Sequence, residues 1–170
     1  MVASNEPKAV VRRFIDEVFL HGRFDAVDEL VTEDFTPHTW GPMPAGRDGL
    51  KQAIERVSAG LSDASMTIED MIAEDDRVAV RLTSSATQTG QFMGIPPSGK
   101  RYEIGEIHWF RLRDGRICEH WHQADFLGML RQLGAMPGGG GAMAGAERGR
   151  STAGATAGTG SGGTGSGPAS

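Results

Sequence analysis

The sequence is poor in the features that mark several common classes of protein. It contains one cysteine, Cys118, and one tyrosine in 170 residues. A single cysteine cannot form an internal disulfide, which favours a reducing compartment over the disulfide-rich secreted class. No apolar run reaches the roughly 18 residues that a membrane span needs, and the N-terminus lacks the basic, apolar and small-residue order of a secretory signal. We therefore expect a cytoplasmic protein without a membrane partner.

Positive charge is also scarce. Lys and Arg number 17 against 22 Asp and Glu, which gives a formal net charge of -5 at pH 7. A nucleic-acid-binding protein needs a basic face, and the aromatic residues here are not accompanied by a basic stripe. No GxxxxGK[ST] phosphate loop and no GxSxG nucleophile elbow occurs. We therefore expect no nucleic-acid partner.

The composition changes abruptly after Met136. The last 34 residues hold 13 of the 25 glycines and almost no large apolar side chain. Such a segment cannot bury enough apolar surface to offset the entropy of ordering. The sequence therefore predicts one folded domain at residues 1–136 and a disordered tail rich in Gly, Ala, Ser and Thr at residues 137–170.

The order of the expected elements indicates an α+β fold. Apolar residues recur at three- and four-residue steps from Val10 to Phe19, which predicts an amphipathic helix that ends at His21 and Gly22. From residue 65 the apolar period changes to two, which is typical of strands. Helices followed by an antiparallel sheet predict helices packed on one sheet face. The other expected elements are helices at 25–31, 46–60 and 126–133 and strands at 66–72, 77–89, 102–112 and 116–124.

Asp114-Gly115 is a strong signal for a two-residue hairpin turn. If pairing proceeds regularly outward from Arg113 opposite Arg116, the two strands present two distinct faces. One face grades from apolar to polar, as a cavity with an apolar floor would, and carries Ile104, Glu106, His108, Phe110 and Leu112 with Ile117, Glu119, Trp121, Gln123 and Asp125. The other face carries Gly105, Ile107, Trp109 and Arg111 with Cys118, His120, His122 and Ala124.

The same register bears on a metal site. His120 and His122 have the His-x-His spacing of zinc ligands. In the regular register His108 points to the opposite face, so the pair lacks a third ligand there. The arrangement favours ordinary half-exposed histidines, and no metal site is expected.

Several polar residues have a structural and a functional interpretation. Asp125 lies where a strand ends and an apolar helix begins, so it either caps that helix or serves as a general acid and base. His108 is either a hydrogen-bonded sheet histidine or a catalytic group. His38 and Trp40 belong to a proline-rich segment that either lines a site or packs as a loop.

Two segments resemble a known family. The segment QTGQFMGIPPSGKRYEIGEIHWFRLRDGRICEHWHQADFLGMLRQLG is similar to the second half of SnoaL-like polyketide cyclases, also called ester cyclases, of the nuclear-transport-factor-2-like superfamily. The earlier FTPHTWGPMPAGRDGLKQAI resembles their loop before the third helix. The resemblance covers roughly residues 5 to 135, and FMGIPPSGK and DGRICEHWHQAD are its most specific parts.

The resemblance implies a cone-shaped α+β barrel, also called cystatin-like, with a curved antiparallel sheet packed on the N-terminal helices. It implies closure of a polyketide ring by intramolecular aldol condensation without a metal or organic cofactor. An aspartate at the position of Asp125 is the proposed acid and base of that family. Many relatives carry His where this chain has Gln88, which argues against a shared proton relay at that position.

These observations combine into one leading hypothesis. Asp125 takes a proton from a carbon next to a carbonyl, and His108 or Gln123 holds the developing enolate. The ligand is expected to be small and hydrophobic, with a polycyclic ring system. A homodimer is expected through the face of Ile107, Trp109, His120 and His122. The residues expected to bind substrate are Phe14, His38, Trp40, Gln88, Glu106, Phe110, Trp121 and Gln123.

Three alternatives remain open. A steroid-isomerase-like site would use a tyrosine donor, and Tyr102 lies on the pocket face near its rim. An epoxide hydrolase would need an Asp-Arg-Asp set, but Arg111 falls on the opposite face and Arg81 has no assigned place. The third alternative is a non-catalytic domain for small-molecule binding or assembly, because a fold does not fix a function.

Overall fold

The computed structural model describes residues 5–39 and 44–136, which lie in one compact unit at residues 1–139. Trp40 and the predicted tail at 137–170 lie outside the described residues. The elements follow the predicted order except for one additional strand between the second and third predicted helices. In chain order they are α1 (Asn5–Arg13), η1 (Phe14–Leu20), α2 (Phe24–Leu30), β1 (Val31–Pro37), α3 (Gly46–Ser58), β2 (Leu61–Glu74), β3 (Arg77–Gln88), β4 (Arg101–Arg113), β5 (Arg116–Ala124) and α4 (Phe126–Leu133).

The five strands form one sheet in the order β1-β5-β4-β3-β2. Strands β2 to β5 pair antiparallel as predicted, but β1 pairs parallel to β5, so the sheet is mixed rather than wholly antiparallel. The sequence analysis missed β1. In that strand Val31 and Phe35 are buried, four residues apart, so the two-residue period that marks a strand is absent.

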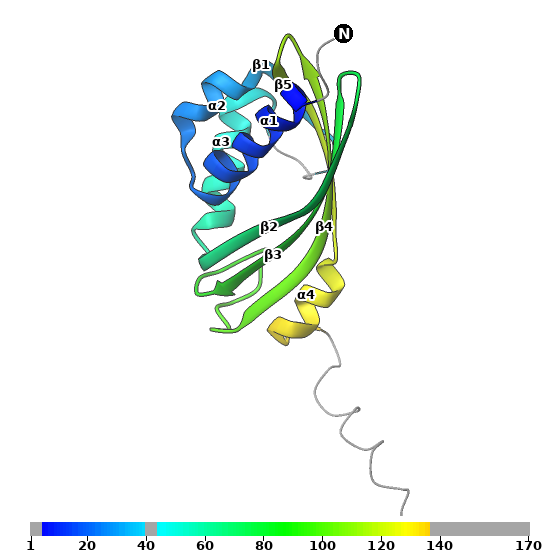
Figure 1. Cartoon of the computed structure of the whole chain (residues 1–170). Helices are drawn as coiled ribbons and strands as arrows, with labels where there is room; N and C mark the ends of the chain where they lie inside the picture. Colours follow the sequence, from blue (N-terminus) through cyan, green and yellow to red (C-terminus); the bar gives the residue numbers. More distant parts are fainter. Residues whose placement is uncertain (1–4, 40–43, 137–170) are drawn as a thin grey trace, which may run out of the picture. The chain divides into compact units, whose positions relative to one another are not determined.

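The helices are divided between two parts of the curved sheet. In Figure 1, α1, α2 and α3 gather against one part, and α4 lies beside β4 at the other end of the strands. The main core fills the space between α1, η1, α2, α3 and the sheet, with fully buried Phe14, Phe35 and Phe110 among its largest side chains. A second cluster beneath α4 comprises Ala86, Phe92, Tyr102, Ile104, Met129 and Leu133. The predicted α+β fold with helices packed on a curved sheet is confirmed.

The predicted first helix changes its winding halfway along. It is α-helical over α1 and π-helical over η1, and it ends before Gly22, whose φ is 62°. Phe14, Ile15 and Val18 of η1 are buried against the sheet, which confirms the amphipathic pattern. No helix in residues 5–39 and 44–136 has the length and apolar character to cross a membrane.

The hairpin between β4 and β5 contains a β-bulge just after its turn. Asp114 and Gly115 form the predicted turn, with φ of 51° and 74°, and Arg113 pairs with Arg116. Leu112 still pairs with Ile117, but the next pair is Arg111 with Glu119, which leaves Cys118 as the extra residue. The predicted regular register is therefore wrong beyond this point, and the remainder of β5 shows the opposite face.

Two interactions explain the position of the bulge. Ile117 and Cys118 are both buried although they are consecutive, so two neighbouring side chains turn inward. Moving Glu119 outward places its carboxylate 2.9 Å from the guanidinium of Arg111. The bulge thus exchanges a buried carboxylate for a cross-strand ion pair at the surface.

Candidate functional site

The bulge brings three histidines and a glutamate to the inner face of the sheet. His108 on β4 pairs with His122 on β5, Phe110 pairs with His120, and Glu106 pairs with Ala124. The expectation that His108 points away from His120 and His122 is therefore wrong. The expectation that Glu106, His108 and Phe110 share the inner face is confirmed by their burial.

These side chains form a continuous hydrogen-bonded group, which we call the Glu106 cluster: Ser84, Glu106, His108, His120 and His122. Oε2 of Glu106 lies 3.0 Å from Nε2 of His108 and 2.9 Å from Nε2 of His122. The Ser84 hydroxyl donates to Oε1 of Glu106. Nδ1 of His108 lies 3.0 Å from Nε2 of His120. The carboxylate of Glu106 on β4 therefore accepts hydrogen bonds from three side chains. One lies on its own strand, and the other two lie on the neighbouring strands β3 and β5.

Burial and hydrogen bonding act in opposite directions on this group. Burial alone would raise the pKa of Glu106, but hydrogen bonds from His108, His122 and Ser84 outweigh it and hold that pKa well below its ordinary value. Burial is the main cause that lowers the pKa of His108, and it lowers the pKa of His120 further. The cluster therefore holds an ionised carboxylate and neutral imidazoles at His108 and His120.

Aromatic rings enclose the cluster. The ring of Phe19, from η1, lies 5.8 Å from the rings of both His108 and His120. The ring of Phe110 stacks on His120 with centroids 4.5 Å apart, and the rings of Phe126 and His122 are nearly perpendicular with centroids 5.9 Å apart. The side chain of His122 keeps 16% of its surface exposed, against 3% for His108 and 10% for Glu106. The cluster is thus reached from the side of His122 and α4.

Asp125 caps helix α4. Its Oδ1 accepts a hydrogen bond of 2.8 Å from the backbone amide of Gly128, which confirms the capping interpretation. The residue is exposed, so the interpretation of a carboxylate buried in an apolar cavity is wrong in that respect. Asp125 directly follows Ala124, the partner of Glu106, and its backbone amide donates to the carbonyl of Gly105, so the bulge moves Asp125 out of the row of Glu106 and His108 predicted from the regular register and places it where β5 meets α4.

Three residues expected to line the pocket lie on the outer face instead. Trp121 pairs with Trp109, and Gln123 pairs with Ile107, so both point away from the Glu106 cluster because of the bulge. The ring of His38 stacks on Trp121 with centroids 4.2 Å apart, and His38 Nε2 lies 2.8 Å from a Glu119 oxygen. His38 and Trp121 are therefore neighbours as expected, but outside the inner face.

Other predicted site residues serve the packing of the domain. Phe14 and Phe110 are fully buried in the main core rather than on the wall of an open pocket. Gln88 is also fully buried, and its side chain bonds with the backbone and Ser98 of the loop that follows it. Tyr102 is buried beneath α4 rather than at a rim, and burial, with the negative charge of Glu106, raises its pKa to about 12.

The arginines that a hydrolase would need lie on the outer face. Arg111 bonds with Asp76 and Glu119, and Arg81 bonds with Asp70. All of these pairs are at least partly exposed. Neither arginine faces the Glu106 cluster, so the described part of the chain does not support an Asp-Arg-Asp site there.

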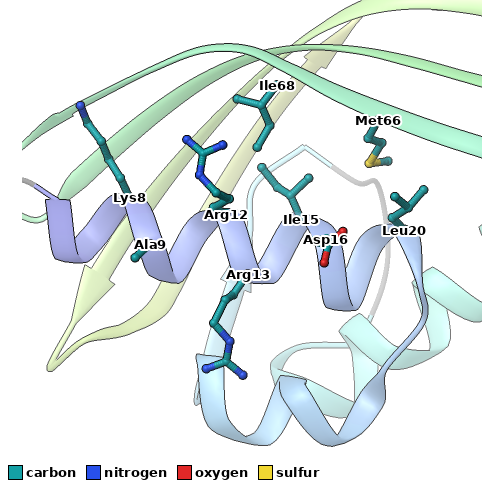
Figure 2. A pocket seen from close by; sticks show the side chains of 9 residues that line it. All are labelled: Lys8, Ala9, Arg12, Arg13, Ile15, Asp16, Leu20, Met66 and Ile68. Atoms are coloured by element: carbon teal, nitrogen blue, oxygen red, sulfur yellow. The ribbon is translucent and has the colours of Figure 1, made fainter.

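A surface groove lies away from the predicted site. It has a volume of ≈ 750 Å³ and runs between α1, η1 and β2 (Figure 2). Ile15, Leu20, Met66 and Ile68 give it an apolar lining, and Lys8 and Arg12 add positive charge at its edge. None of the residues predicted to bind substrate contributes to this groove.

Comparison with known proteins places this architecture among polyketide cyclases. A family model described as SnoaL-like polyketide cyclase matches residues 9–133. A nogalonic acid methyl ester cyclase of Streptomyces nogalater is 33% identical over 119 residues, which cover 68% of this chain and 89% of that protein. The aklanonic acid methyl ester cyclase DauD of Streptomyces sp. (strain C5) is 28% identical over 130 residues, 74% of this chain and 80% of that protein. The solved structure of TsrD from Streptomyces laurentii superposes with a TM-score of 0.74 at 29% identity and covers 80% of this chain and 100% of TsrD.

Proposed function

Because the chain belongs to the SnoaL-like polyketide cyclase family, we propose that it closes a ring of a polyketide methyl ester by an intramolecular aldol-type condensation. Relatives are named as cyclases of nogalonic and aklanonic acid methyl esters, so the substrate proposed for this chain is an ester of the same polycyclic class. Flat, apolar and rich in carbonyl groups, such a substrate needs an apolar surface beside groups that move protons.

The observation that carries this proposal is the surface around Asp125. Phe126 and Leu127 directly follow it and are 41% and 48% exposed, so two adjacent large apolar side chains lie at the surface beside the carboxylate. His122 lies against Phe126 from the inner face. This end of the domain therefore combines exposed apolar surface, a carboxylate and an imidazole within a few residues of one another, as aromatic polyketide chemistry requires.

In the proposed reaction the carboxylate of Asp125 removes a proton from the carbon between two carbonyl groups. The resulting enolate carbon attacks a ketone carbon of the same molecule, which forms the new carbon–carbon bond and leaves an alkoxide. The alkoxide takes the proton back from Asp125, so atoms and charge balance over the cycle. His122 replaces Gln123 as the proposed partner of the enolate oxygen, because His122 is the one that faces inward.

The two roles of Asp125 can be separated by substitution. Asparagine caps a helix about as well as aspartate but cannot accept the substrate proton. We expect Asp125→Asn to fold with a stability within about 0.5 kcal/mol of the parent and to lose turnover of both methyl esters by about 100-fold or more, the range of a lost general base. Full turnover by Asp125→Asn would overturn the proposed role.

Gln123→Ala is the matched control. Gln123 lies two residues from Asp125, but it pairs with Ile107 and points away from His122, so its loss should leave turnover unchanged. If the parent protein binds both esters tightly and converts neither of them, the proposed cyclase activity is wrong and the chain is a binding domain.

A further inference from the structure

We propose that Glu106, His108 and His122 form a binding site for a divalent transition-metal ion of the zinc type. Each residue offers one ligand atom: Oε2 of Glu106, Nε2 of His108 and Nε2 of His122. These three atoms all lie within 4.8 Å of one another, on two adjacent strands of the inner face. This inference rests on the geometry of the cluster; it shares His122 with the proposed cyclase reaction but does not involve Asp125.

The spacing of the ligand atoms suits direct coordination. Oε2 lies 3.0 Å from one imidazole nitrogen and 2.9 Å from the other. Two ligands at about 2.1 Å from an ion are roughly 3.0 Å apart when they subtend a right angle, and roughly 3.4 Å apart in a tetrahedral site. The two imidazole nitrogens lie within 4.8 Å of each other and their rings are stacked with centroids 4.5 Å apart, so the imidazoles turn toward the ion when it binds.

The donor set selects the class of ion. Two imidazole nitrogens and one carboxylate oxygen suit Zn²⁺, Co²⁺, Fe²⁺ and Ni²⁺, whereas Mg²⁺ and Ca²⁺ prefer oxygen ligands throughout. Three protein ligands leave at least one coordination position open. The partial exposure of His122 places that opening on the side of α4, where a water or a ligand oxygen can reach it.

Residues next to the three ligands are placed so that they can orient the ligand side chains, as the neighbours of ligands in metal sites generally do. A metal-binding histidine generally donates its second ring N–H to a fixed acceptor. Nδ1 of His108 lies 3.0 Å from Nε2 of His120, which fixes the ring and can accept that proton when Nε2 of His108 turns to the ion. The Ser84 hydroxyl donates to the other oxygen of Glu106 and so orients the carboxylate.

The proton count shows what distinguishes the two states of the cluster. Without an ion, Nε2–H of His108 and Nε2–H of His122 donate to Glu106, and His120 donates to Nδ1 of His108. With an ion, the proton of each ligand histidine resides on Nδ1, and His120 becomes the acceptor for His108. In both states His108 and His120 keep the hydrogen bond between them, and the carboxylate of Glu106 offsets one of the two positive charges of the ion.

The test measures metal binding on the full chain without an affinity tag, after removal of metals with a chelator. Equilibrium dialysis against Zn²⁺ is expected to give about one ion per chain, and Co²⁺ is expected to produce visible ligand-field absorption. His122→Gln is the main variant, because His122 is the most exposed ligand and its loss disturbs the core least. We expect it to weaken Zn²⁺ binding by more than the 10–100-fold that the loss of a supporting group costs.

Two further variants make the result specific. His38→Gln removes a histidine that contacts a carboxylate at 2.8 Å on the outer face, and it should leave metal binding unchanged. Asp125→Asn should also leave metal binding unchanged, so the metal site and the proposed cyclase reaction can fail separately. Ser84→Ala is expected to weaken binding about tenfold while the three ligands remain.

Circular dichroism of each variant establishes that it is folded. Absence of stoichiometric Zn²⁺ binding by the parent chain would overturn the proposal. So would binding by folded His122→Gln as tight as that of the parent, or loss of binding in His38→Gln.

Discussion

Replacing Gln88 with leucine tests whether this residue binds substrate or holds the loop that follows β3. The side chain is fully buried. Its Nε2 lies 3.2 Å and 3.1 Å from the carbonyl oxygens of Ile95 and Pro96, and its Oε1 accepts a hydrogen bond of 2.6 Å from Ser98. We therefore expect Gln88→Leu to act on stability rather than on substrate affinity.

The size of the effect follows from these contacts. Leucine has nearly the volume of glutamine, so little cavity is created, and the cost comes from polar groups that lose their partner. Each buried group left without a hydrogen bond costs about 1–3 kcal/mol. Nε2 carries two protons and lies within 3.3 Å of three carbonyl oxygens, those of Gly90, Ile95 and Pro96. Pro96 is exposed and the other two residues are half-buried, so water replaces part of the loss. We expect a loss of about 2–3 kcal/mol.

Urea unfolding followed by circular dichroism measures this loss. With a dependence on urea of about 1–3 kcal/mol per molar, the midpoint should fall by about 1 M. Gln132→Leu is the matched control, because Gln132 also makes two side-chain hydrogen bonds, both of 2.9 Å to the backbone of Glu103, but on the surface. Its loss should cost less than about 1 kcal/mol.

One result would refute this reasoning. If Gln88→Leu unfolds within about 0.5 kcal/mol of the parent while KM for the methyl ester rises, Gln88 contacts substrate and the loop does not depend on it. Hydrogen exchange at the amide of Gly99, which donates to the Gln88 carbonyl, gives a second reading. Faster exchange there is expected only if the loop has been released.

Three further predictions concern other parts of the domain. Tyr102 is the single tyrosine, and its pKa of about 12 exceeds the ordinary value near 10. The stability that its neutral form contributes is therefore complete below pH 10 and is lost as pH rises toward 12. An ultraviolet titration should show a higher ionisation midpoint in the native than in the denatured protein, and a native midpoint near 10 would contradict this prediction. Gly128→Ala places a Cβ too close to Oδ2 of Asp125, so the carboxylate must shift and turnover should fall. Stability should change by less than about 1 kcal/mol, because the better helix propensity of alanine offsets a disturbed cap; unchanged turnover would argue against the proposed role of Asp125. We propose that the outer face, where Trp109 and Ile107 are 42% and 54% exposed, pairs with a second copy of the chain. Light scattering should then show a dimer for the parent protein and a monomer for Trp109→Arg. A monomeric parent would contradict the proposed interface.

Most of the fold could be predicted because its signals are local. The helices are amphipathic, the antiparallel strands alternate, and the turns at Asp75-Asp76 and Asp114-Gly115 contain residues that accept positive φ. Strand β1 could not be predicted in this way. It is short, only Val31 and Phe35 are buried, and its parallel partner lies more than eighty positions later in the chain. Pairing over such a distance leaves no trace in a short window of sequence.

The candidate site was predicted less well, and one residue accounts for most of the difference. Glu106, His108 and Phe110 precede the bulge and were assigned to the correct face. Trp121 and Gln123 follow it and were assigned to the wrong one. A signal for the bulge was present in the charges. The regular register places Glu119 beside Phe110 inside the domain, whereas a shift by one residue places it beside Arg111 at the surface.

The bulge at Cys118 also affects how this chain should be aligned with its relatives. Cys118 is the one residue of β5 that the β4–β5 ladder leaves without a partner, so its removal would close the ladder while every pair from Arg111–Glu119 onward is kept. A relative with a regular hairpin would therefore match this chain only with a one-residue gap at Cys118. An ungapped comparison would align the relative's counterparts of Trp121 and Gln123 with His120 and His122 of this chain. It would therefore report that the relative lacks the two histidines, although they would be present one position away.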